Sequence, residues 1–181
     1  MKSLNCLLAL IAITLIALVP SGFACGCVVI PGQILEDHVG KSVNLATVVF
    51  EGKVVGFEYR KGIFNEYVSG LRDAFGKPRK YETMLVRFKV DRWWKGGLAP
   101  EVMLATGETR NSDGSGTTTT CEFNFAKDET YLVFAVPDKP GALPRTSNCS
   151  LTGASKDDGV EKIIQVLGES TAPKKPRGKR N

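Results

Sequence analysis

Apolar and polar residues alternate along the centre of the chain in a pattern that predicts five short β-strands. We expect them at residues 43–57, 83–93, 102–106, 117–125 and 130–136. In the second strand, alternate residues from Met84 to Val90 are apolar and share one face. In the first, Glu51, Gly52 and Lys53 interrupt the apolar residues, so we expect a bend or a bulge. Five short strands with glycine breaks predict a mainly β fold, a closed or nearly closed five-stranded barrel.

Two further segments have helical spacing. Apolar residues recur every three or four positions in residues 63–75, which predicts a helix or a collapsed loop against the barrel, or alternatively a ridge that binds a partner. The second helix is expected near 156–167, with Asp157 or Asp158 as its cap and Gly168 as its end. Between the strands, residues 107–116 are polar and glycine-rich, which indicates a mobile loop.

The N-terminus has the pattern of an export signal. Lys2 precedes an uncharged apolar run at residues 4–19, and Gly22 and Ala24 are small residues at −3 and −1 of a cut after Ala24. The run is shorter than the about 20 residues that a membrane-spanning helix needs. We therefore expect residues 1–24 to be a signal peptide and the protein to be extracellular or periplasmic. The alternative is a lipoprotein anchored at Cys25, but that signal favours a large aliphatic residue where Gly22 stands.

Composition fits one globular domain, which we place at residues 25–168. The chain has 181 residues, 43% of them hydrophobic and 24% charged, with a net charge of +5. The excess positive charge lies in residues 169–181, whereas residues 25–167 carry equal numbers of both signs. We therefore expect no nucleic-acid partner. The basic tail is expected to be disordered, with binding to anionic surface polymers or lipid headgroups as the alternative.

Four cysteines remain after signal removal: Cys25, Cys27, Cys121 and Cys149. An even number in an exported domain predicts two disulfides. A bond between Cys25 and Cys27 would close a very small strained ring, so each is expected to bond to Cys121 or Cys149, in either order. A zinc site made by these cysteines is disfavoured, because Cys-Gly-Cys is shorter than the usual ligand spacing and the chain has a single histidine.

We predict no enzymatic activity and no cofactor, because no nucleophile–base pair or ligand cluster is visible. The histidine, His38, is expected in a surface loop. Of Trp93 and Trp94, one is expected in the core and the other partly exposed. The alternative is that they form a stacking platform for carbohydrate or bases. Asn148 lies in a glycosylation acceptor pattern. We expect a monomer.

A mature chain that begins Cys25-Gly26-Cys27-Val28 resembles the inhibitory domain of the tissue inhibitors of metalloproteinases, which are related to netrin-like modules. The resemblance covers about 25–153. It is carried, in order, by Phe50-Glu51-Gly52-Lys53-Val54, Arg87-Phe88-Lys89-Val90, Trp94-Lys95-Gly96, Cys121-Glu122-Phe123, Tyr131-Leu132-Val133-Phe134-Ala135 and Thr146-Ser147-Asn148-Cys149-Ser150. The family's fold is a five-stranded barrel of the oligonucleotide- and oligosaccharide-binding type. The resemblance further implies that Cys25 bonds to Cys121 and Cys27 to Cys149.

By the same resemblance, Cys25, Gly26, Cys27 and Val28 would bind a zinc metalloprotease. The amine and carbonyl of Cys25 would chelate the catalytic zinc of that protease. The chain departs from the family by lacking a third cysteine pair and the second, cysteine-rich subdomain. It also has glycine at position 26, where the family's side chain enters a specificity pocket. The alternative function is therefore a non-inhibitory netrin-like module that binds a protein or a polymer.

Overall fold

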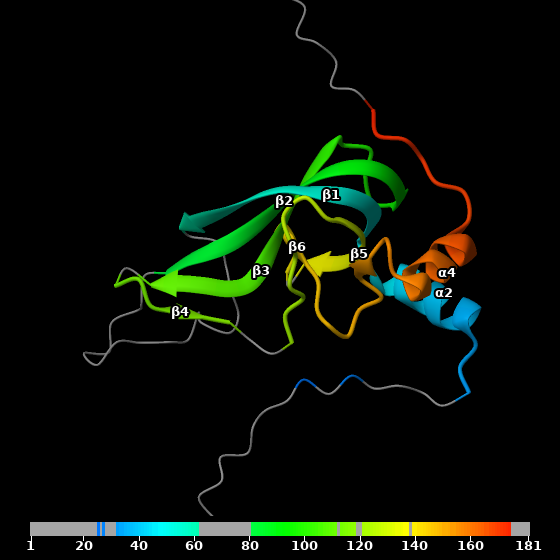
Figure 1. The fold of residues 1–181 in the computed structure, drawn as a ribbon, viewed down its shortest axis with the longest axis horizontal. Helices are drawn as coiled ribbons and strands as arrows, with labels where there is room; N and C mark the ends of the chain where they lie inside the picture. Colours follow the sequence, from blue (N-terminus) through cyan, green and yellow to red (C-terminus); the bar gives the residue numbers. More distant parts are fainter. Residues whose placement is uncertain are drawn as a thin grey trace, which may run out of the picture.

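In the part of the chain that the structure describes, the fold is mainly β, and the strands form one antiparallel sheet with two helices at one end (Figure 1). The computed structural model describes residues 25, 27, 32–61, 81–111, 113–118, 121–137 and 139–174. Within these residues the elements are α2 (Leu35–Leu45), β1 (Val48–Lys61), β2 (Tyr81–Lys95), β3 (Glu101–Asn111), β4 (Gly116–Thr117), β5 (Thr130–Pro137), β6 (Pro144–Arg145), β7 (Gly153–Ala154) and α4 (Asp158–Leu167). The mainly β prediction is confirmed.

The strand order is β4-β3-β2-β1-β5-β6, with β7 also paired to β5. Among the described residues the hydrogen-bonded path does not return from β6 to β3, so the expected closed barrel is not formed as a continuous ladder. The path nevertheless comes close to closing, because β3, the strand next to its β4 end, lies against β6. The sheet is therefore strongly curled, with its concave side filled by side chains.

The expected bend in the first strand is present in β1. Its pairing with β2 shifts register between Val49 and Phe50, between Glu51 and Gly52, and again beyond Val54. A β-carbon at Gly52 would approach the carbonyl oxygen of Lys89 to 2.7 Å, so the close crossing of the two strands requires glycine there. These irregularities increase twist and allow one strand to belong to both halves of the curled sheet.

Two apolar clusters lie on opposite sides of β1. Phe50 packs inside the curled sheet with Phe88 and Trp93, whereas Val49 faces the helices. The strand is consequently buried on both faces from Val48 to Glu51, which explains its lack of clean alternation. Trp93 is buried and Trp94 is half-buried, as the sequence predicted.

The helices cover the second cluster, and α2 corrects two expectations. Residues 43–45 end a helix rather than begin a strand, because Leu35, Val39 and Val43 recur every four residues and face the cluster together. His38 is exposed, but it lies on this helix and not in a loop. The expected C-terminal helix is confirmed as α4, with Gly168 at φ 68° after its last turn. The expected helix at 63–75 lies outside the described residues.

Two loop and strand expectations were wrong between β3 and β5. Residues 107–111, expected in a mobile loop, continue β3, and a turn at Gly114 leads into β4. Within the described part of 117–125, only Thr117 and Glu122 pair as in a sheet, and Glu122 does so through a single bridge to Ser147. Phe123 and Phe125 of this segment do pack on the core. Their burial accounts for the strand-like alternation, although the backbone forms no ladder.

The first part of the basic tail is also ordered. Thr171 exchanges two backbone hydrogen bonds with Trp93, and the amide of Lys174 donates to the carbonyl of Leu98. The expectation of disorder from residue 169 is therefore wrong as far as 174, because this backbone pairs with the end of β2. Among the described residues no helix has the length and apolar character needed to cross a membrane.

Candidate functional site

Two disulfides attach the start of the expected mature chain to two distant segments. Cys25 bonds to Cys121 and Cys27 bonds to Cys149, with Cα–Cα distances of 5.0 and 5.1 Å. This is the order that the family resemblance implies, and the sequence pattern alone left it open. Disulfides of this kind form in oxidising compartments, so they indicate an extracellular or comparable environment.

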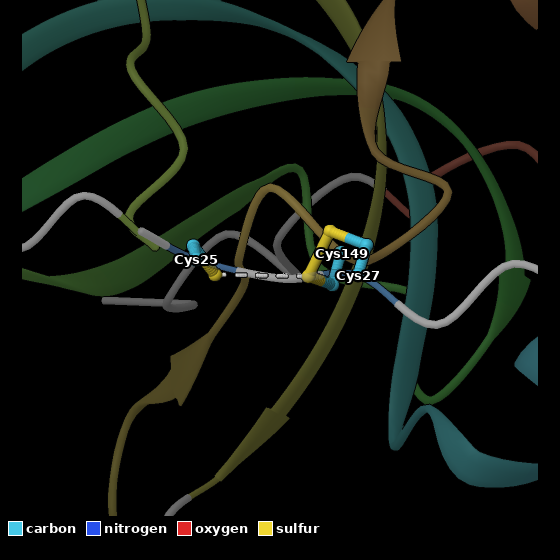
Figure 2. Close-up of side chains that lie close together, drawn as sticks. All are labelled: Cys25, Cys27 and Cys149. Carbon is cyan, nitrogen blue, oxygen red and sulfur yellow. Dashed lines mark hydrogen bonds between the residues drawn. A yellow bond between two sulfur atoms is a disulfide. The ribbon is translucent and has the colours of Figure 1, made fainter. Parts of the chain in front are cut away.

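The sulfur atoms of the two disulfides touch each other. Figure 2 shows Cys25 pointing toward the bond between Cys27 and Cys149, and the Sγ atoms of Cys25 and Cys149 are 3.7 Å apart. The Sγ atoms of Cys25, Cys27 and Cys149 all lie within 4.8 Å of one another. Cys27 and Cys149 are exposed and Cys25 is half-buried. The other two expected protease-binding residues, Gly26 and Val28, lie outside the described residues.

The segments that carry Cys121 and Cys149 are held side by side by contacts other than the disulfides. The amide of Asn148 donates to the carbonyl oxygen of Cys121 over 2.9 Å, and Glu122 forms a β-bridge with Ser147. The amide of Cys149 also donates to the hydroxyl of Ser147. These bonds hold Cys121 and Cys149 side by side independently of the disulfides. We call these two residues the anchors.

A buried ion pair lies directly beneath the anchors. Arg145 donates to Glu122 over 2.5 Å, and their side chains are 9% and 8% exposed. Gly107 on β3 lies against the Glu122 carboxyl group, where a β-carbon would not fit. The pair is costly to break, because removing one member leaves an uncompensated buried charge. It therefore holds Glu122, the residue after Cys121, in position. Sequence reasoning missed this pair, because Glu122 and Arg145 are 23 residues apart and meet only in the folded chain.

A pocket of about 270 Å³ opens beside the anchors. Its lining includes apolar side chains from α2 and β5, namely Leu45, Phe134 and Val136. It also includes polar side chains from the segment around Cys149, namely Arg145, Thr146, Ser147 and Ser150. Cys121 and Cys149 belong to the same lining. Leu45 and Val136 are the large apolar side chains at this pocket that stay exposed.

A second polar cluster lies on the projecting ends of β1, β2 and β3. The hydroxyl of Tyr59 donates to the carboxylate of Glu108, and this bond raises the pKa of Tyr59, with burial adding to the effect. The guanidinium of Arg110 stacks on the Tyr59 ring at 4.2 Å and bonds to Glu82 over 2.8 Å. The bond to Arg110 lowers the pKa of Glu82 and raises that of Arg110.

The structure thus brings the four cysteines together, whereas His38 lies on the exposed face of α2. Asn148 is exposed beside Cys149. In the oxidised state, the sulfurs are bonded in pairs and offer no thiolate to a metal ion. The arrangement ties Cys25 and Cys27 to the body of the protein at two points. No family model matches the chain, and no curated protein is similar to it.

Proposed function

We propose that the protein is a secreted inhibitor of zinc metalloproteases, with a mature chain that begins at Cys25. One observation carries the proposal: Cys25 and Cys27 are separately bonded to Cys121 and Cys149, two residues that lie side by side. A chain fixed at its first and third residues presents a rigid terminus, which reduces the ordering cost of binding.

The chemistry uses the backbone of Cys25. A protease zinc keeps one coordination position open for water. The α-amine and the carbonyl oxygen of one residue can occupy the metal together and displace that water. An α-amine has a pKa of about 8 in peptides, so a useful fraction is neutral and able to coordinate at pH 7. In this proposal Gly26, Cys27 and Val28 follow the metal ligand into the protease cleft.

A barrel of the oligonucleotide- and oligosaccharide-binding type is the fold that we infer for the domain. The curled sheet, the bulged first strand and the approach of β3 to β6 support this finer assignment. The protein itself has no catalytic role in the proposed mechanism, and the protease supplies the zinc.

A second candidate is a non-inhibitory netrin-like binding module, and Gly26 favours it. Glycine has no side chain for the specificity pocket that the family's second residue enters. Burying a valine-sized side chain contributes about 1.5–3 kcal/mol, or one to two powers of ten in affinity. The substitution Gly26→Thr separates the two functions. A weak inhibitor gains affinity from it, whereas a folded variant without any gain supports the module.

The first test combines the mass of the exported protein with inhibition assays against a panel of zinc proteases. We expect a chain that begins at Cys25 with a free amine and inhibits at least one of them. A protein of this mass that inhibits none contradicts the proposal. A mass that includes a lipid also excludes it, because an acylated amine cannot chelate.

Extending the mature chain by one alanine tests the metal-binding step. The extension moves the free amine by about 3.8 Å. It also converts the Cys25 nitrogen into an amide, which is a much poorer ligand. We expect the extended protein to keep both disulfides and its fold but to lose inhibition by at least about 100-fold, which corresponds to about 2.7 kcal/mol. Equal inhibition by the two forms would show that another surface binds the protease.

A further inference from the structure

The four cysteines can also act as metal ligands once their disulfides are reduced. We infer that, once reduced, they form a tetrahedral four-thiolate site for Zn²⁺. The site cannot bind zinc while the disulfides are intact, and reduction by a dithiol makes the four sulfurs available. The inference concerns the reduced protein and does not depend on the proposed inhibitory function.

The sulfur atoms already lie at separations close to those of a tetrahedral zinc site. Zinc–sulfur bonds of about 2.3 Å in a tetrahedron place neighbouring sulfurs about 3.8 Å apart. The non-bonded Sγ atoms of Cys25 and Cys149 are already 3.7 Å apart, and the set with Cys27 lies within 4.8 Å. The Sγ atom of Cys121 is bonded to that of Cys25, so it lies next to this set of three sulfurs. Breaking the two disulfides frees four sulfurs, and each bonded pair must then separate to about 3.8 Å to surround one ion.

Half of the site is held in place without the disulfides. The backbone bond from Asn148 to Cys121, the bridge between Glu122 and Ser147, and the buried Glu122–Arg145 pair all keep Cys121 beside Cys149. Cys25 and Cys27 then complete the set from a neighbouring chain segment. Gly26 between them permits backbone conformations that other residues rarely adopt. The short Cys-Gly-Cys spacing, which disfavoured zinc on sequence grounds, is therefore compatible with both sulfurs facing one ion.

The chemistry balances as follows. Each disulfide accepts two electrons and two protons from one dithiol, which leaves as its own disulfide. Zn²⁺ then displaces the four thiol protons and takes the four thiolates as ligands, which are soft donors that suit this ion. The exposed positions of Cys27 and Cys149 give the ion a route from solvent. The bound metal links the same chain segments that the disulfides link, so it stabilises the reduced fold.

The test uses the exported protein, reduced without air by a phosphine, since an added dithiol would itself compete for the metal. Co²⁺ is titrated as the probe, because tetrahedral thiolate coordination gives it intense, characteristic absorption bands, and Zn²⁺ is then added. We expect one Co²⁺ per chain with these bands, displaced by one Zn²⁺. Binding by the reduced protein should be at least about 100-fold tighter than by the same protein in concentrated urea, because folding assembles the ligands.

The controls isolate the four sulfurs. The oxidised protein and the reduced, alkylated protein should show none of these bands. Cys27→Ser should lower the affinity at least about tenfold. Ser42→Ala, which changes a residue of the pocket beside Cys121 and Cys149, should leave it unchanged.

Three results would overturn the inference. The first is a reduced protein without tetrahedral thiolate bands. The second is an affinity that urea does not change. The third is full binding by Cys27→Ser. Urea unfolding of the reduced protein with and without Zn²⁺ gives an independent readout, in which the metal should raise the midpoint.

Discussion

At the scale of single residues, Gly107 constrains the site most tightly. A β-carbon at this position of β3 would overlap the carboxyl group of Glu122, so Gly107→Ala pushes Glu122 away from Arg145. The variant combines overpacking with a disturbed buried ion pair. We expect it to lower the free energy of unfolding by about 2–3 kcal/mol, near the upper end for overpacking. Urea unfolding of variant and wild type measures the difference.

Gly40 provides the matched control for this prediction. It lies in the middle of α2, where a β-carbon would contact nothing within 4 Å. Gly40→Ala should therefore raise the free energy of unfolding by about 0.5–1 kcal/mol, the usual gain in a helix interior. Similar effects of the two substitutions would contradict the steric role that we assign to Gly107.

Glu82 should give the protein an acid-sensitive contribution to stability. Its pKa in the folded protein is lowered, first by the hydrogen bond from Arg110. The contribution is therefore complete above the unfolded pKa, about 4.3, and is lost as the pH falls through the lower folded value. We expect wild type to be more stable than Glu82→Gln at pH 7, and the difference to disappear once the pH falls below the folded pKa of Glu82.

The measurement is urea unfolding of both proteins across this pH range. The pair is exposed, so added salt should narrow the difference at pH 7. A difference that persists in acid would assign the effect to packing of the side chain and not to its charge.

At the scale of elements, the sequence predicted strands best where burial leaves a simple pattern, either alternation on a half-buried strand or a continuous apolar run on a fully buried one. The expected strand at 83–93 matches β2 because its solvent side is polar, and 130–136 matches β5 because it is continuously apolar. The pattern failed at residues 43–45, where β-branched and apolar residues belong to α2. The helical spacing of Leu35, Val39 and Val43 was present, but the apolar run that follows concealed it.

The segment 117–125 failed for a different reason. Apolar alternation reports which side chains are buried, and Phe123 and Phe125 do pack on the core. It does not report whether the backbone finds a neighbouring strand, which depends on the rest of the fold. Tertiary context therefore decided the backbone pairing that the local pattern left open.

The attachment of α4 to the sheet can be tested through Ile163. This side chain is 8% exposed and packs in the cluster that contains Val39 and Leu132. Ile163→Ala should cost about 2–4 kcal/mol of unfolding free energy, because the cavity between helix and sheet cannot fully close. Lys162→Ala, next to it on the exposed face, should change stability by less than about 0.5 kcal/mol. Equal effects would indicate that α4 is not part of the cooperative unit.

At the scale of the whole molecule, the sequence identified the four cysteines but could not order their pairs. Cys25 and Cys27 are one residue apart, so either order closes loops of similar length, and only the resemblance to a family favoured one. The pocket and the Glu122–Arg145 pair could not be predicted, because their residues come from α2, β5, β6 and the loops that carry Glu122 and Cys149, and they meet only in the folded chain.

Because Cys25 and Cys27 are separated by a single residue, the stabilising effects of the two disulfides depend on each other. Each bond alone links residues 96 or 122 positions apart, which in the chain-entropy account contributes roughly 5 kcal/mol. With one bond in place, the second closes a loop of only about 30 residues and contributes roughly 3–4 kcal/mol.

Replacing either pair by alanine should therefore cost roughly 3–4 kcal/mol, and replacing both pairs should cost roughly 8–9 kcal/mol. The stability lost by removing both bonds exceeds the sum of the two single losses by roughly 1 kcal/mol. The reason is that the bond left in each single variant still restricts most of the loop that the missing bond closed. Urea unfolding of wild type, Cys25→Ala/Cys121→Ala, Cys27→Ala/Cys149→Ala and the fourfold variant measures the excess. Single losses that already reach roughly 5 kcal/mol each would show that the bonds act independently, which would contradict a shared anchor point for the start of the mature chain.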